Sequence, residues 1–449
     1  MSAWSAGPLA AAGRLAELVR FPTVSSIDRS AEDEVAFRAL KDRIPLLWPG
    51  VAASIPREEV GDRGLLYEWR GGEAALAPAI LCAHFDVVSP GELSAWSHPP
   101  FSGDIADGSV WGRGTQDIKV LLAAIMEASE ALLAEGFRPR RTVLFAFGGD
   151  EEISGRRGAG RIAARLAERG LRASFVLDEG SPVSHGVLPF VERPLALVGV
   201  TQKGYVDIQL EARGPGGHSS MPPRRSATAC LGRAVAALED RPFPSRLTAS
   251  ASAFLSALLP HMSPAYRRAF RALRLCPPLL KALLLASPTT AALVRTTTAT
   301  TMLHGSEATN VLPDKATATV NVRMLPGDDS AGVLARVGRV VARYGVKASI
   351  PPEASLVEPL PESPVDHEGF RAIAAAVGEA FPGAAAIPFL FIADTDTKHY
   401  RNIAEALYRF CALDMDGADI ERIHGIDERV SIDNYSRCVA FYSSLLRSL

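Results

Sequence analysis

An apolar strand that runs into three consecutive carboxylates is the feature that most limits how this chain can fold. Residues 142–147 are the predicted strand, and two glycines separate it from Asp150, Glu151 and Glu152. Because like charges repel one another, three carboxylates at the end of a buried strand cost free energy. A bound cation would remove that cost. Because neighbouring side chains diverge on an extended segment, Glu151 and Glu152 can take different tasks, one as a metal ligand and one as a proton carrier. A solvated acidic loop is the alternative interpretation.

Two other apolar segments also end in residue types that bind metals. Residues 79–83 run into His84 and Asp86, and residues 174–177 run into Asp178. Asp86 lies on the same face of an extended chain as His84, so it can orient the imidazole. Helical patterns separate these strands, and such alternation predicts a parallel sheet covered on both faces. Because sites in such sheets form beyond the carboxyl ends of the strands, we expect these side chains to converge.

Two further candidate ligands come from separate loops. Asp117 follows a glycine-containing loop and precedes a helical pattern over 118–133, where a helix N-cap is its alternative role. His424 lies near the end of the chain. Five candidates are too many for one open tetrahedral site and predict two metals that share Asp117, with zinc favoured and cobalt or manganese tolerated. Such a pair polarises a carbonyl and holds a hydroxide, with Glu151 as general base. The five candidate ligands are His84, Asp117, Glu152, Asp178 and His424.

The pattern changes near Lys203. Residues 205–212 alternate strictly between apolar and polar side chains, which is typical of an antiparallel sheet with one wet face. A helix, two strands, a helix and a strand follow, as in a small ferredoxin-like α+β unit. The predicted fold class is α/β, a mostly parallel doubly wound sheet with helices on both faces plus this inserted lid or dimerisation domain. We expect catalytic parts at 1–202 and 356–449 and the inserted domain at 203–355.

The segment from about 241 to 295 is too long for a simple connection. We interpret it as short apolar helices with basic residues along the middle. One hypothesis is an acyl-binding wall that favours long-chain N-acyl amino acids, and the alternative is lid packing or a dimer interface. Further on, Ser363 and the proline after it are typical of a helix start.

The amino-acid composition excludes some classes of function for this chain. The 449 residues exceed one ordinary core and indicate two domains. With 22% charged residues and a net charge of −2, the chain offers no electrostatic case for a nucleic acid partner. Five scattered cysteines without a C-x-x-C pair indicate reduced thiols. No signal-like start or long uncharged apolar stretch occurs, so we expect a cytoplasmic protein without a membrane span.

Several motifs together resemble the M20 metallopeptidase family, and the match covers nearly the whole chain. They are His-Phe-Asp-Val-Val at 84–88, Gly-Arg-Gly-Thr-Gln-Asp-Ile-Lys at 112–119, Gly-Gly-Asp-Glu-Glu at 148–152, Leu-Asp-Glu-Gly at 177–180 and the late His424. The branch of carboxypeptidase S and the N-acyl-amino-acid hydrolase/synthases is the most similar. That likeness rests on the sequences at 215–220, 295–303 and 422–426.

The resemblance assigns roles to individual residues. It implies that His84 and Asp178 hold one metal, that Glu152 and His424 hold the other, and that Asp117 bridges them. It further implies that Glu151 is the base and that Asp86 supports His84.

The resemblance also extends to the inserted domain. It implies that His218 stabilises the oxyanion, often across a dimer interface, and that Asn310 and Arg323 bind substrate. An arginine fork is a natural clamp for a free carboxylate, and a solvent-facing charge is the alternative for Arg323. Lys398 stands where that branch more often has arginine.

The expected function is a two-zinc amidohydrolase that cleaves the amide between an acyl or peptidyl group and a C-terminal amino acid. Its partners would be small peptides or N-acyl amino acids and a second copy of the chain. A dipeptidase, tripeptidase or small-acyl deacylase would share every catalytic residue. A non-catalytic metal-binding relative would be marked by a lost ligand, and none is missing.

Overall fold

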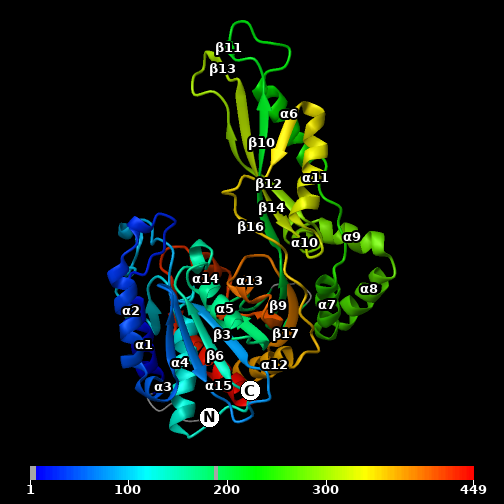
Figure 1. The fold of residues 1–449 in the computed structure, drawn as a ribbon. Helices are drawn as coiled ribbons and strands as arrows, with labels where there is room; N and C mark the ends of the chain where they lie inside the picture. The colour runs from blue at the N-terminus through cyan, green and yellow to red at the C-terminus, as the bar shows by residue number, and fades with distance from the viewer. Residues whose placement is uncertain (1–6, 187–190) are drawn as a thin grey trace.

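The computed structural model describes residues 7–186 and 191–449, which form a large layered body and an elongated lid that rises from it (Figure 1). The layered body contains a ten-stranded sheet in which β17 pairs with β9 beside the main path. The main path runs β1 (Arg57–Val60), β2 (Gly64–Trp69), β6 (Val143–Gly148), β3 (Ala79–His84), β7 (Ala173–Asp178), β18 (Ala404–Arg409), β9 (Leu195–Gln202), β8 (Val183–Ser184) and β19 (Asp414–Met415), and β17 spans Ala385–Phe391.

The strands that carry the predicted ligands lie side by side. β6, β3, β7 and β18 run parallel to one another, whereas β1 and β2 join the edge antiparallel. The predicted strands at 79–83, 142–147 and 174–177 are confirmed to within a residue or two at each end. Their carboxyl ends therefore meet at one edge of the sheet, as expected for a parallel arrangement.

Helices cover both faces of this sheet, which confirms the predicted α/β class. Leu81 on β3 points into the larger apolar core, whereas Ile80 and Cys82 point into the smaller one on the opposite face. The sheet is thus buried on both sides, which explains its near-continuous apolar strands. The larger core takes side chains from α1 (Gly7–Val19), α2 (Glu34–Leu47), α3 (Pro49–Ser54), α4 (Lys119–Ala134), α12 (Glu368–Ala380) and α15 (Ile432–Ser448), and the smaller one from α5 (Ala159–Glu168) and α13 (Thr397–Tyr400).

The helix predicted to start at Ser363 begins later. α12 starts at Glu368, after His367, whose ring accepts a hydrogen bond from the backbone N–H of Gly369. The Ser363 hydroxyl instead donates to the Leu407 carbonyl and accepts from the Leu407 N–H, at 2.9 and 2.8 Å. This prediction was wrong because a tertiary hydrogen bond to β18 uses the serine that local sequence offered as a cap.

The lid has the predicted ferredoxin-like topology. Its sheet has the order β12, β14, β10, β15, all antiparallel, and two helices cover one face. Residues of β10 alternate between buried and half-buried, as the sequence pattern predicted. The elements are β10 (Gly204–Arg213), α6 (Ala227–Glu239), β12 (Thr297–His304), β14 (Lys315–Met324), α11 (Ser330–Val341) and β15 (Val346–Ser349), and β16 (Leu356–Val357) adds to β10.

The helical insertion packs on the large sheet rather than on the lid sheet. Its core contains Leu195 of β9 and Ile387 of β17. The buried Lys203 fastens its end by donating to the carbonyls of Ala292 and Arg295, at 3.1 and 2.9 Å. The predicted domain boundary between residues 202 and 203 thus falls at a contact between the layered body and the lid. The insertion consists of α7 (Ala249–Leu258), α8 (Pro264–Arg274), α9 (Pro277–Leu285) and α10 (Pro288–Val294).

The structure also bears on the prediction that the chain has no membrane span. Among residues 7–186 and 191–449, no helix has both the length and the apolar character needed to cross a membrane.

Candidate metal centre and active site

His84, the last residue of β3, is 1% exposed and presents one ring nitrogen to the sheet edge. Its Nδ1 lies 3.0 Å from the carbonyl oxygen of Asp86 and 3.3 Å from the carboxylate Oδ1 of the same residue. An Nδ1–H that donates to these acceptors leaves Nε2 as the lone-pair atom. The second nitrogen is therefore available to bind a metal.

Asp117 lies between the two predicted imidazoles. Its Oδ1 is 3.1 Å from Nε2 of His84, and its Oδ2 is 2.9 Å from Nε2 of His424. The alternative role as a helix N-cap does not hold, because α4 has Ile118 at that position and no capping side chain. Asp117 thus offers one oxygen to each side, which is the arrangement that a bridging carboxylate needs.

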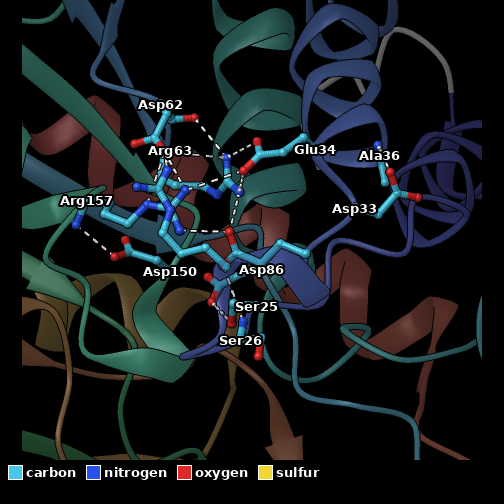
Figure 2. Close-up of polar contacts among 12 residues, drawn as sticks. Ser25, Ser26, Asp33, Glu34, Ala36, Asp62, Arg63, Asp86, Asp150 and Arg157 are labelled. Carbon is cyan, nitrogen blue, oxygen red and sulfur yellow. Dashed lines mark hydrogen bonds and ion pairs between the residues drawn. The ribbon is translucent and has the colours of Figure 1, made fainter.

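The three carboxylates after β6 take three different directions. Asp150 is buried and turns away from the imidazoles, because its oxygens accept the backbone N–H groups of Arg157 and Gly158, both at 2.7 Å (Figure 2). Glu152 places Oε2 3.3 Å from Nε2 of His424, and Glu151 places Oε2 4.0 Å from Nε2 of His84. The run is therefore part of the site and not a solvated loop.

Asp86 ties the imidazole of His84 to the acidic run. Its Oδ1 accepts the N–H of Glu151 at 3.1 Å, and its Oδ2 accepts the N–H of Glu152 at 3.2 Å. The hydroxyl of Ser25 donates to Oδ2 at 2.7 Å (Figure 2). These three donors fix the orientation of the fully buried carboxylate. It positions His84 and the two glutamates with respect to one another.

Asp178 is the last residue of β7, and its neighbour Glu179 reaches the site. Asp178 is 2% exposed; its Oδ1 accepts the Glu179 N–H at 2.9 Å, and its Oδ2 has no hydrogen-bond partner. Glu179 places Oε1 3.6 Å from Nε2 of His84. Sequence reasoning missed Glu179, although the divergence of adjacent side chains applies here as it does to Glu151. Metal binding by Asp178 stays a prediction.

Electrostatics favour a cation in this cluster. Burial raises the pKa of Glu151 and of Glu179 well above the usual value. Hydrogen bonds to Asp117 and then Glu152 raise the pKa of His424 to about 10. Burial opposes the charge on His84, but Asp117 and Asp86 still raise its pKa. Several buried anions thus compete for few protons, and a divalent cation would relieve their repulsion.

The donor set of the described residues fits such a cation. His84, Asp117 and Glu152 each offer a ligand atom within 4.8 Å of the others, and so do His84, Glu151 and Glu179. Oε1 of Glu152 is buried without a hydrogen-bond partner, as is Oδ2 of Asp178 noted above. Orphaned buried acceptors of this kind call for a further binding partner. Imidazole and carboxylate donors together suit zinc, cobalt or manganese.

Glu428 holds two parts of the site together and was also missed from the sequence. It is fully buried, and its Oε1 accepts the N–H groups of Gly114, Gln116 and Asp117 at 3.0, 2.7 and 3.1 Å. Its Oε2 pairs with Arg113 at 2.5 Å, and Arg113 also donates to the Gly425 carbonyl at 2.8 Å. The loop of Asp117 is thereby joined to the segment of His424. The one signal in the sequence is Arg113, a cation in a glycine-rich loop that needs a partner.

The lid residues lie apart from this cluster. His218 on β11 (Gly217–His218) is exposed and accepts the Ser220 N–H at 3.2 Å, and the N–H of Ser219 donates to Asn310 at 3.0 Å. Figure 1 places β11 and β13 (Val311–Leu312) at the lid tip, remote from β3. The guanidinium of Arg323 on β14 stacks over the Tyr205 ring. Within one chain, the described structure does not bring these three predicted residues to the metal ligands.

Known proteins are similar to this sequence over most of its length. The sequence model of peptidase family M20/M25/M40 matches residues 80–448. Probable carboxypeptidase S-like 2 of Dictyostelium discoideum is 38% identical over 97% of this chain and 84% of that protein. The N-fatty-acyl-amino acid synthase/hydrolase PM20D1 of Xenopus tropicalis is 35% identical over 96% of this chain and 84% of that protein.

Solved structures share the fold. The M20 family metallo-carboxypeptidase Sso-CP2 from Sulfolobus solfataricus superposes with a TM-score of 0.70 at 17% identity, covering 96% of this chain and 97% of that one. The YXEP protein of Bacillus subtilis, a dinuclear metal-binding peptidase, has a TM-score of 0.59 at 15% identity, with 98% and 97% covered. With a family model over most of its length and relatives that span it almost entirely, the chain belongs to peptidase family M20/M25/M40 and is a metal-dependent hydrolase.

Proposed function

We propose that this chain hydrolyses the amide bond between an acyl or peptidyl group and a C-terminal amino acid, at a centre of two divalent metals, with zinc as the proposed ion. The observation that carries the proposal is Asp117, whose two oxygens face the Nε2 atoms of His84 and His424. The two relatives, a probable carboxypeptidase S-like protein and an N-fatty-acyl-amino acid synthase/hydrolase, have names that fit this reaction.

The residues divide into two sets around the shared carboxylate. His84 and Asp178 would hold one metal, and Glu152 and His424 the other, with Asp117 between them. When bound, such a pair supplies Lewis acidity to the substrate carbonyl and lowers the pKa of water. Glu179, 3.6 Å from His84, is an additional candidate on the first side.

Glu151 is the proposed general base. Its Oε2 lies 4.0 Å from Nε2 of His84, and burial raises its pKa, which makes its carboxylate a stronger proton acceptor than that of an exposed glutamate. In this role Glu151 accepts the proton of the attacking water and then delivers it to the leaving amide nitrogen. The backbone bonds from Glu151 and Glu152 to Asp86 keep the base beside the ligands.

Replacement of the base tests the mechanism. Glu151→Gln keeps the shape of the side chain but removes the proton acceptor, so turnover should fall by roughly 100- to 10,000-fold while folding and metal content persist. Glu168→Gln on α5, where the carboxylate is 70% exposed, is the matched control and should keep full activity. Unchanged hydrolysis by Glu151→Gln would remove this residue from the mechanism.

Metal stoichiometry and a substrate panel test the rest of the proposal. Elemental analysis should find two ions per chain, and less than one would favour a non-catalytic relative. Rates on N-lauroyl amino acids, N-acetyl amino acids and dipeptides, with zinc or cobalt restored, separate an N-acyl-amino-acid hydrolase from a dipeptidase or a small-acyl deacylase. A clear preference for N-acetyl substrates would defeat the long-chain hypothesis.

A further inference from the structure

The helical insertion forms a cavity of its own, open to solvent on one side and separate from the metal ligands. This insertion cavity has a volume of about 580 Å³ and lies among α7, α8, α9 and α10. Phe254 and Leu258 of α7 line it together with Leu284 of α9 and Leu293 of α10, all of them buried. No residue identified above as a metal ligand contributes to its wall.

The wall of the insertion cavity has few groups that can form hydrogen bonds with water. Its lining is apolar apart from a few hydroxyl groups, and the Thr290 hydroxyl is already used, because it donates to the Leu284 carbonyl at 2.6 Å. An apolar cavity of about 150 Å³ stays dry and takes up benzene, a ring of six carbons. By the same ratio the insertion cavity has room for on the order of 20 carbon atoms.

The volume also limits the kind of occupant. A helix with side chains is about 10 Å across and rises about 5.4 Å per turn, so the cavity has room for about one turn. That is too little to bind a partner helix. An unbranched alkyl chain, which is one carbon wide, fits the volume and matches the chemistry of the wall.

Charge on the insertion indicates the sign of the head group. Residues 241–295 contain eight basic residues and no acidic residue, in a chain whose net charge is −2. On α8, Ala269 and Phe270 line the insertion cavity, whereas the exposed Arg268 and Arg271 do not. The same short helix therefore presents an apolar wall to the cavity and cations to solvent, so the positive field around the insertion favours a ligand with an anionic head.

We propose that the insertion cavity binds one unbranched alkyl chain of an anionic amphiphile, whose carboxylate head remains in solvent outside the cavity. The site is distinct from the metal centre and does not depend on the hydrolase reaction, because binding requires no turnover. Two compounds can supply this alkyl chain, a free long-chain carboxylate or an N-acyl amino acid through its acyl group.

Calorimetric titration of the metal-loaded protein with monomeric carboxylates tests the site. Affinity should rise about fourfold for each added methylene from octanoate to dodecanoate, because each buried methylene contributes a constant increment. Ala269→Trp fills the cavity and should weaken dodecanoate binding at least tenfold. Ala272→Trp, on the same helix but outside the lining, is the matched control and should bind as the wild type does. Equal affinity for both chain lengths, or full binding by Ala269→Trp, would overturn the proposal.

Two further experiments identify the head group of the ligand and the source of its alkyl chain. The charge reversal Arg268→Glu with Arg271→Glu should weaken binding of dodecanoate severalfold but not of dodecanol, and an equal loss for both would refute the carboxylate assignment. Hydrolysis of N-lauroyl glycine that slows in Ala269→Trp, while N-acetyl glycine does not, identifies the substrate as the source. Unchanged rates on both identify a free carboxylate. Binding to anionic vesicles without binding of monomeric dodecanoate would replace the cavity site with a membrane surface.

Discussion

Predicted catalytic residues lie both at the sheet edge and at the lid tip, but only those at the sheet edge are held by surrounding contacts. At the sheet edge, His84 is buried and contacted on both ring nitrogens, and Asp86 holds the backbone of the acidic run. At the lid tip, His218 is exposed, and in the described structure its ring hydrogen-bonds only to Ser220, two residues later. The difference teaches that one chain preorganises the candidate metal centre, whereas any catalytic role of the lid tip needs another surface to complete it.

The largest expected effect comes from breaking the ordered side of this comparison. Asp117→Asn keeps the shape of the proposed bridging side chain but removes its charge, so hydrolysis should fall on the order of 1,000-fold or more. Elemental analysis should show loss of bound metal in the same protein. Asp107→Asn, in an exposed turn ten residues earlier, is the control and should change neither quantity. Full metal content and activity in Asp117→Asn would exclude a bridging role.

The next effect tests whether the lid tip acts on a second copy of the chain. His218→Ala should lower turnover by roughly 100- to 1,000-fold without changing metal content, as expected for loss of an oxyanion donor. A mixture with Glu151→Gln should regain activity, since a mixed dimer contains one site with both wild-type residues. Random pairing predicts about a quarter of wild-type activity. No recovery in a demonstrated mixed dimer would assign His218 to its own chain or to no catalytic role.

A smaller effect is expected from the residue that joins the two loops of the centre. Glu428→Gln removes the charge that pairs with Arg113 and that accepts three backbone N–H groups. Metal affinity should fall by about 10- to 100-fold, with activity restored at high metal concentration. Competition with a chelator measures this shift directly. A loss of activity that excess metal does not rescue would mean that Glu428 acts on folding alone.

The smallest effect concerns the buried Lys119 behind Asp117. Burial lowers its pKa to about 7, while its ammonium donates to the carbonyls of Leu18 and Phe21. Below pH 7 both folded and unfolded chains carry this charge, and the folded chain bears the cost of burying it. Between pH 7 and about 10.4 the unfolded chain binds more protons, so this group makes the free energy of unfolding rise with pH.

Denaturant melts across that pH range compare wild type with Lys119→Met. The contribution of Lys119 to the slope should disappear in the variant. An identical pH dependence in both proteins would show that the ammonium stays charged in the folded state.

The sequence by itself determined the parallel sheet, the ferredoxin-like lid and the convergence of His84, Glu151 and Glu152 at one edge. These follow from local rules, because side-chain periodicity defines each strand and parallel strands end together. The contacts of Glu428 and Glu179, and the start of α12 at Glu368, were decided only by the tertiary structure. Each depends on hydrogen bonds or packing between segments that are distant in sequence, which no local pattern records. The helical insertion combines the two cases. Its apolar helices were predictable from the sequence, but its cavity and its position on β17 arise only when the helices pack against the sheet.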